Sequence, residues 1–160
     1  MTLREFTLDD IEALAVGAWI LGTGGGGSPY LGLLNMRRLY AEGHRVSLMS
    51  AAELADDDWV AAVSNMGAPL VGQERLTDSR TIARAVALME EHTQYRFRGI
   101  MALEIGGGNS IQPLMAAAHL KRPVIDESGA NAGLHSFRVV PKENGDAALL
   151  AAIRRQLGLH

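Results

Sequence analysis

The chain has 160 residues, of which 48% are hydrophobic, and its 15 Lys and Arg against 18 Asp and Glu give a formal charge of −3. This length suits one domain, and the absence of a broad basic field argues against nucleic acid or an anionic membrane as a partner. Because the chain has no cysteine, disulfides, thiolate metal sites and a cysteine nucleophile are excluded.

The start of the chain and its apolar runs indicate where the protein resides. Acidic residues interrupt the first twelve positions, so we expect no signal peptide. No apolar run approaches the roughly 18 residues that a membrane helix requires. We therefore expect a cytoplasmic protein that does not bind a membrane.

The first part of the chain predicts two helices and then two strands. Thr7 and Asp10 form a capping-box pattern at the start of the first helix, which should end near Leu21. Ser28 followed by proline is typical of the start of a second helix, which should end at Gly43. Short apolar runs then predict a strand, one helical turn and a second strand, at residues 45–49, 51–54 and 59–63.

Helices and strands alternate in the second part of the chain. Asp78 or Ser79 can cap a helix, and a buried strand at 100–105 leads into a second helix that Asn109 or Ser110 can cap. The last predicted elements are two strands and a closing helix, at 122–129, 137–140 and 146–157. This order predicts an α/β fold in which residues 1–160 form a single domain. We expect a largely parallel sheet, flanking helices and two glycine-rich loops at helix N-termini.

The first glycine-rich loop has two interpretations. Gly24, Gly25, Gly26, Gly27 and Ser28 can present bare backbone N–H groups to an anionic or carbonyl-bearing ligand. Alternatively, the glycines only allow a tight reversal between packed helices. The loop is not a P-loop because no Lys-Ser/Thr pair follows it, and it is a poor dinucleotide motif because it follows a helix.

The second glycine-rich loop, EIGGGNS, lies between a predicted strand and a predicted helix. Ligands of open α/β sheets bind beyond the carboxyl ends of the strands, so we expect this loop to bind the substrate. The loop after the strand at 59–63 belongs to the same edge. The candidate binding residues at this edge are Gly106, Gly107, Gly108, Asn109, Ser110, Asn65 and Gly67. Helix capping is the alternative role of Asn109 and Ser110.

Two carboxylates at this edge are the candidate catalytic groups. Glu104 precedes the glycines, where we expect partly apolar surroundings that favour its protonated form. Asp126 ends the next strand, and two carboxylates in different environments can divide the acid and base roles. The alternative for Glu104 is a structural pair with an arginine or with backbone N–H groups.

Other kinds of catalytic site have little support in the sequence. The five histidines lack the spacing of metal ligands, so we expect no metal and no other cofactor. Ser64 lacks the G-x-S-x-G context of a nucleophile elbow, and no Ser-His-Asp combination is evident. The sequence therefore disfavours acyl transfer by a serine nucleophile.

Four motifs in order resemble one known family: GAWILGTGGGGSPYLG, SNMGAPLVGQERL, LEIGGGNSIQPLMAAA and RPVIDESG. Over residues 5–129 the chain resembles the N-terminal domain of the S-methyl-thiohydantoin desulfurase family. The namesake reaction of that family hydrolyses an S-methylated thiohydantoin to a hydantoin and releases methanethiol. Its members usually carry a second domain, which we do not find here, and residues 130–160 form an extension that departs from the family pattern.

The resemblance implies a hydrolase-type domain that acts on a hydantoin-like small molecule. From the sequence itself we expect the glycine loops to stabilise charge on the ring, and Glu104 or Asp126 to activate water. Two alternatives stay open: a non-catalytic small-molecule binding module, and a partial subunit that needs a partner carrying the second domain. The apolar helix faces also allow a homo-oligomer.

Overall fold

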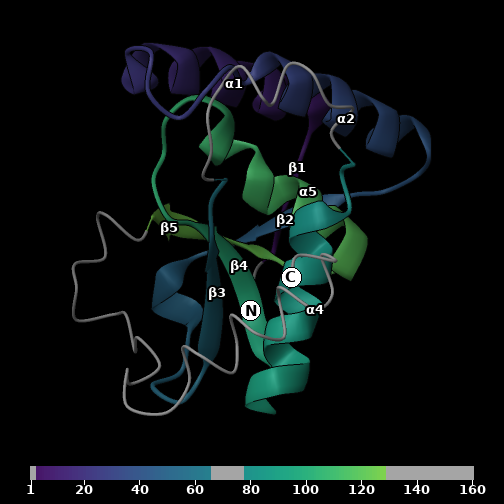
Figure 1. The fold of residues 1–160 in the computed structure, drawn as a ribbon, viewed down its shortest axis with the longest axis vertical. Helices are drawn as coiled ribbons and strands as arrows, with labels where there is room; N and C mark the ends of the chain where they lie inside the picture. The colour runs from purple at the N-terminus through teal and green to yellow at the C-terminus, as the bar shows by residue number, and fades with distance from the viewer. Residues whose placement is uncertain (1–2, 66–77, 129–160) are drawn as a thin grey trace, which may run out of the picture.

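The computed structural model describes residues 3–65 and 78–128, which form a mixed α/β domain (Figure 1). In chain order, the helices and strands are β1 (Arg4–Phe6), α1 (Leu8–Gly22), α2 (Tyr30–Ala41), β2 (Val46–Met49), β3 (Trp59–Val63), α4 (Thr81–Thr93), β4 (Phe97–Ala102), α5 (Gln112–Leu120) and β5 (Val124–Ser128). Two short 3-10 turns, η1 (Ala51–Glu53) and η2 (Gly107–Ser110), lie between them. Within the described residues, no helix has the length and apolar character needed to cross a membrane.

One five-stranded sheet organises the domain, with the strand order β1-β2-β5-β4-β3. The last four strands in this order are parallel, and only β1 runs antiparallel to its neighbour β2. Val124 of β5 lies opposite both Leu48 of β2 and Ile100 of β4, so the last strand of the described chain sits in the middle of the sheet. The prediction of a single α/β domain with a largely parallel sheet is therefore confirmed, although β1 was not expected.

Helix α5 is the central helix of the fold. It contacts the sheet and α4 on one side and α2 on the other, so α1 and α2 form a further layer above it (Figure 1). Its residues from Gln112 to Ala118 are all buried. The core combines this helix with side chains of α1, α2 and the sheet, including Ile11, Met36, Leu39, Ile100 and Val124.

Some predicted helix and strand ends are confirmed and others are wrong. The capping box of α1 is present, since Thr7 Oγ1 accepts the Asp10 N–H and the Asp10 carboxylate accepts the Thr7 N–H. Neither Asn109 nor Ser110 caps α5, because both lie in the turn η2 and the N-cap position of α5 is Ile111. Strand β4 starts three residues earlier than expected and ends at Ala102. The elements predicted at 137–140 and 146–157 lie outside the described residues.

Candidate functional site

The two glycine-rich loops meet at the carboxyl edge of the sheet. The N–H of Gly108 donates to the carbonyl oxygens of both Gly26 and Gly27, each at 2.9 Å. We call this contact between residues 22–28 and 106–108 the glycine junction. Two segments about 80 positions apart in sequence are therefore joined by backbone atoms alone.

Contacts across the glycine junction explain why several of its residues lack a side chain. A Cβ atom on Gly107 would lie 2.2 Å from the Gly27 carbonyl oxygen, and one on Gly26 would lie 2.3 Å from the Gly106 carbonyl oxygen. A Cβ atom on Gly22 would lie 2.7 Å from the Gly107 nitrogen. Because these neighbours are backbone atoms, no side-chain rotation can relieve the clash. The loops leave no room for a ligand between them at these positions.

Gly24 and Gly27 differ from the other glycines of the first loop. Both have a positive φ, of 97° and 74°, and no atom of the described residues lies within 4 Å of the place where a Cβ would stand. The left-handed conformation favours glycine here, whereas close packing does not require it. The space over these two residues is open, so it is the part of the loop that a ligand can approach.

Polar side chains join a third loop to the glycine junction. The buried Asn109 side chain accepts the backbone N–H of Asn65 at 3.1 Å, which brings together two of the predicted binding residues. Ser110, also buried, donates its hydroxyl to the Gly107 carbonyl at 2.8 Å. Ser28 accepts the Tyr30 N–H at the start of α2. Asn109 and Ser110 therefore hold the loops in place and do not cap a helix.

The two predicted catalytic carboxylates are associated with neighbouring strands: Glu104 with β4 and Asp126 with β5. Glu104 lies two residues after the end of β4, whereas Asp126 is the middle residue of β5, two residues before its carboxyl end. Both side chains are exposed. Within the described residues, the prediction of partly apolar surroundings for Glu104 is therefore wrong. Within those residues neither carboxylate has an ion pair or hydrogen bond, and both are open to a ligand from solvent.

The remaining predictions for the site concern Gly67 and a metal. Gly67 lies outside the described residues. Over residues 3–65 and 78–128, no group of three or more His, Asp or Glu side chains is placed to hold a metal ion.

A cavity of about 390 Å³ lies away from the glycine junction, between β3 and α4. Its walls are mostly apolar and include Trp59, Val86, Met89 and Phe97, and the rings of Trp59 and Tyr95 stack at its side with centroids 4.1 Å apart. None of the predicted binding or catalytic residues of the carboxyl edge lines it. The cavity therefore does not provide the apolar surroundings that were expected around Glu104.

Ser79 and His119 form a contact that the sequence analysis missed. Ser79 Oγ lies 2.9 Å from His119 Nε2, and the ring of His44 stands edge-on to the His119 ring at 5.3 Å between centroids. Burial, followed by the positive charges of His44 and Arg80, lowers the pKa of His119. Within the described residues no carboxylate bonds to this ring, so a Ser-His-Asp combination is not assembled.

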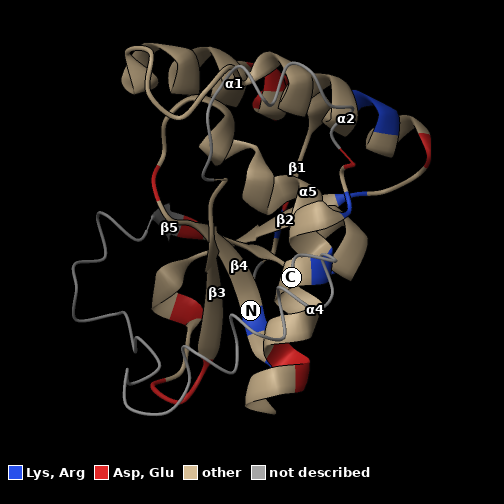
Figure 2. Cartoon of the chain, in the orientation of Figure 1, with Lys and Arg blue, Asp and Glu red and all other residues tan. Residues whose placement is uncertain are grey.

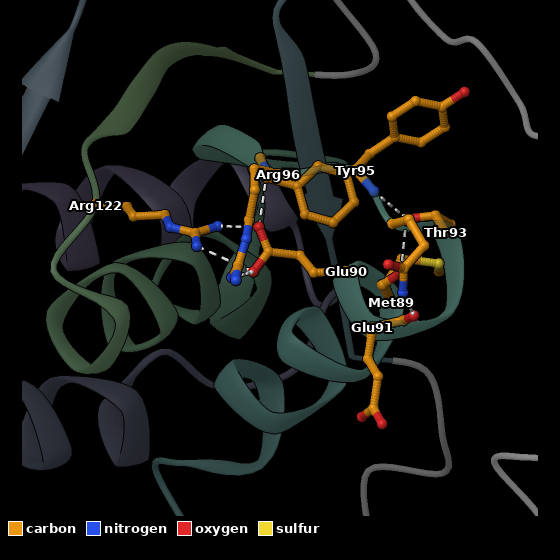
Figure 3. Close-up of polar contacts among 9 residues, drawn as sticks. Met89, Glu90, Glu91, Thr93, Tyr95, Arg96 and Arg122 are labelled. Carbon is orange, nitrogen blue, oxygen red and sulfur yellow. Dashed lines mark hydrogen bonds and ion pairs between the residues drawn. The ribbon is translucent and has the colours of Figure 1, made fainter.

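A second missed cluster surrounds Glu90 at the amino edge of the sheet (Figure 3). Arg122 donates from two nitrogens to the two carboxylate oxygens of Glu90, and Arg96 and the Phe97 N–H donate as well. The hydrogen bond from Arg122 is the main reason why the pKa of Glu90 lies below its ordinary value, and burial opposes it. Glu90 falls at helical spacing with the apolar residues Ile82 and Val86, a signal that could have revealed a buried carboxylate.

Comparison with known proteins identifies the family. A family model described as "S-Me-THD-like, N-terminal domain" matches residues 9–131, while a search of curated proteins finds no match. The fold is similar to the crystal structure of a protein from Chromobacterium violaceum, with a TM-score of 0.58 and 24% sequence identity over 78% of this chain. That region is 34% of the Chromobacterium chain, so the present chain spans about a third of its length. The extent of the family match shows that the chain belongs to the S-Me-THD-like family, as its N-terminal domain.

Proposed function

We propose that this domain takes part in the hydrolysis of a hydantoin-like small molecule, with S-methyl-thiohydantoin as the type of substrate. Membership of the S-Me-THD-like family over residues 9–131 is the observation that carries the proposal. The site lies at the carboxyl edge of the sheet, on the outer side of the glycine junction. Two observations on the described residues support this position: the open backbone at Gly24 and Gly27, and the exposed carboxylates of Glu104 and Asp126, which have no partner among those residues.

The reaction assigned to the site is a water attack on an sp² ring carbon that carries a methylthio group. A carbon–oxygen bond forms and the carbon–sulfur bond breaks. One proton of the water ends on the ring nitrogen and the other on the departing methanethiol. Glu104 or Asp126 removes a proton from the attacking water, the other carboxyl protonates the sulfur, and backbone N–H groups stabilise charge on the ring.

The exposure of both carboxylates favours a second candidate function. Active sites that carry out such chemistry exclude bulk water, whereas the Glu104 side chain is exposed. The similar Chromobacterium protein is about three times as long as the region that it shares with this chain. The alternative is therefore a binding module, or a subunit whose site is completed by a partner that covers the carboxyl edge.

A methanethiol assay tests the proposal. Because the chain has no cysteine, a thiol-reactive dye reports released methanethiol without background from the protein. We expect turnover of S-methyl-thiohydantoin by the unaltered chain and a loss of at least about 100-fold for Glu104→Gln. Glu91→Gln is the matched control, since Glu91 is also exposed but points away from the fold at the end of α4 (Figure 3).

The possible outcomes separate the two candidate functions. Equal turnover by Glu104→Gln and the unaltered chain would refute the role of Glu104. Thermal stabilisation by hydantoins without methanethiol release favours the binding module or the incomplete subunit. Stabilisation by inorganic phosphate alone would overturn the hydantoin proposal altogether.

A further inference from the structure

The α1–α2 layer exposes several large apolar side chains to solvent. Six large side chains, here called the α1–α2 face, are between 40% and 68% exposed: Val16, Trp19, Ile20, Tyr30, Leu31 and Leu34. The opposite side of α1 is apolar too, since Ile11, Ala15 and Ala18 are buried in the core. A helix that is apolar on all sides is normally buried on all sides.

An ion pair marks one end of the α1–α2 face. Arg37 donates to Glu12 at 2.7 Å, which fixes α1 and α2 side by side and antiparallel. Beyond this ion pair, residues 13–36 contain no Asp, Glu, Lys, Arg or His. In Figure 2 the end of the layer next to the glycine loop, at the left of the view, is accordingly tan. The face therefore runs from the ion pair at one end to the glycine junction at the other.

We propose that the α1–α2 face binds the same face of a second copy of this chain, which makes the protein a homodimer. Six side chains of this size, about half exposed, present roughly 600–700 Å² of surface, close to the ~800 Å² that each partner contributes to a standard interface. The face pairs with itself without repulsion, because it holds no charge although the chain carries a net charge of −3. A monomer seldom leaves an apolar patch of this size in water.

The small residues of α1 suit a two-fold contact between helices. Over residues 3–65 and 78–128, nothing lies within 4 Å of the place where a Cβ on Gly17 would stand, so a partner helix can approach the backbone there. Ile20 lies one turn after Gly17, at i+3, and its exposed side chain can pack beside the approaching helix. In a contact of this kind each residue meets its counterpart or a near neighbour in the second copy.

Sedimentation velocity on the 160-residue chain tests the dimer. We expect a dimer at micromolar concentration, and an affinity at least about 100-fold weaker for Ile20→Glu because it buries two like charges. Ala87→Glu, at an exposed position on α4, should leave the dimer intact. Both positions are exposed in the monomer, and circular dichroism confirms that each variant is folded.

Cross-linking gives an independent readout, since the chain has no cysteine of its own. Oxidation should join two copies of Val16→Cys but not two copies of Ala87→Cys. A monomeric unaltered chain at 100 µM would overturn the proposal, as would a dimer that survives Ile20→Glu. If the unaltered chain is monomeric and instead binds the remaining part of a longer S-Me-THD-like protein, the face serves that partner and the homodimer is refuted. Neither measurement depends on methanethiol release, so failure of the proposed function leaves this test unaffected.

Discussion

The glycine junction and the Glu90 cluster join the chain at opposite edges of the same sheet, and they do so with different chemistry. At the carboxyl edge, two loops meet through backbone atoms and have no side chain between them at Gly26 and Gly107. At the amino edge, the buried carboxylate of Glu90 accepts hydrogen bonds from two arginines and one backbone N–H. The first junction depends on shape, whereas the second depends on charge.

This difference predicts how each edge responds to change. A backbone junction is insensitive to pH, but it does not accept a single methyl group. A carboxylate cluster accepts small changes of shape, but it loses its stabilising effect when the charge is removed. At the carboxyl edge, Glu104 and Asp126 are exposed and pair with no charged group among the described residues.

The largest effect is expected for Gly107→Ala. The new Cβ would lie 2.2 Å from the Gly27 carbonyl oxygen, and the φ of +55° is unfavourable for alanine. We expect the free energy of unfolding to fall by at least about 4 kcal/mol, as measured by urea denaturation. Gly17→Ala is the control, since none of the other described residues lies near that position in α1, and it should stabilise the monomer by roughly 0.5–1 kcal/mol. Equal stability of the two variants would mean that the loops are not in contact.

A smaller effect that depends on pH is expected for Glu90→Gln. Removing one partner of a buried ion pair leaves Arg122 uncompensated, so the free energy of unfolding should fall by about 3 kcal/mol at pH 7. The pKa of Glu90 is lowered in the folded state, mainly by the hydrogen bond from Arg122. Its stabilising contribution is therefore fully present above the ordinary value of 4.5 and is lost as the pH falls through the folded-state pKa.

Unfolding of both proteins between pH 7 and pH 3 checks this prediction. The difference between the unaltered chain and Glu90→Gln should narrow below pH 4.5. Exposed Glu91 is the control position, where replacement by Gln should change stability by less than about 0.5 kcal/mol. A difference that stays constant down to pH 3 contradicts an ionised Glu90 in the folded protein.

The smallest effect is expected for Asn109→Ala. The Asn109 side chain links the glycine junction to the loop after β3. Loss of the hydrogen bond from the Asn65 N–H should cost about 1–2 kcal/mol of stability. Hydrogen exchange at the Asn65 amide should become faster, while exchange in β4 stays unchanged. Asn35→Ala on α2 provides a control in which no such bond is removed. Unchanged exchange at Asn65 would show that Asn109 does not hold this loop.

The sequence was sufficient for most of the fold because its signals are local. A capping box at Thr7 and apolar runs at β2, β3 and β5 each act over a few residues, and all of these elements are present. Strand β1 was missed because three residues are too few to show alternation. The start of α5 was misassigned because Asn109 and Ser110 match a capping pattern, although Asn109 bonds to the loop after β3 and Ser110 bonds to Gly107 within its own turn.

The candidate site was predicted less completely, because its main features depend on contacts distant in sequence. Glycine content indicates an unusual backbone, but it does not reveal that Gly108 donates to Gly26 or that Gly107 packs on Gly27. The exposure of Glu104 depends on what covers the sheet edge, which a strand pattern does not specify. The Glu90 cluster brings together residues from α4, β4 and the turn before β5, so no short motif contains it.

The position of β5 has a consequence for how the chain folds. Strand β5 is made last among the described strands, yet it separates β2 from β4 in the sheet. Before it is in place, the β1–β2 pair and the β3–β4 pair share no strand contact and each has an uncovered edge. Pairings between residues so far apart in the chain form slowly and leave strand edges open to other chains in the meantime. During synthesis, the sheet of this domain can therefore close only after residues 124–128 have left the ribosome.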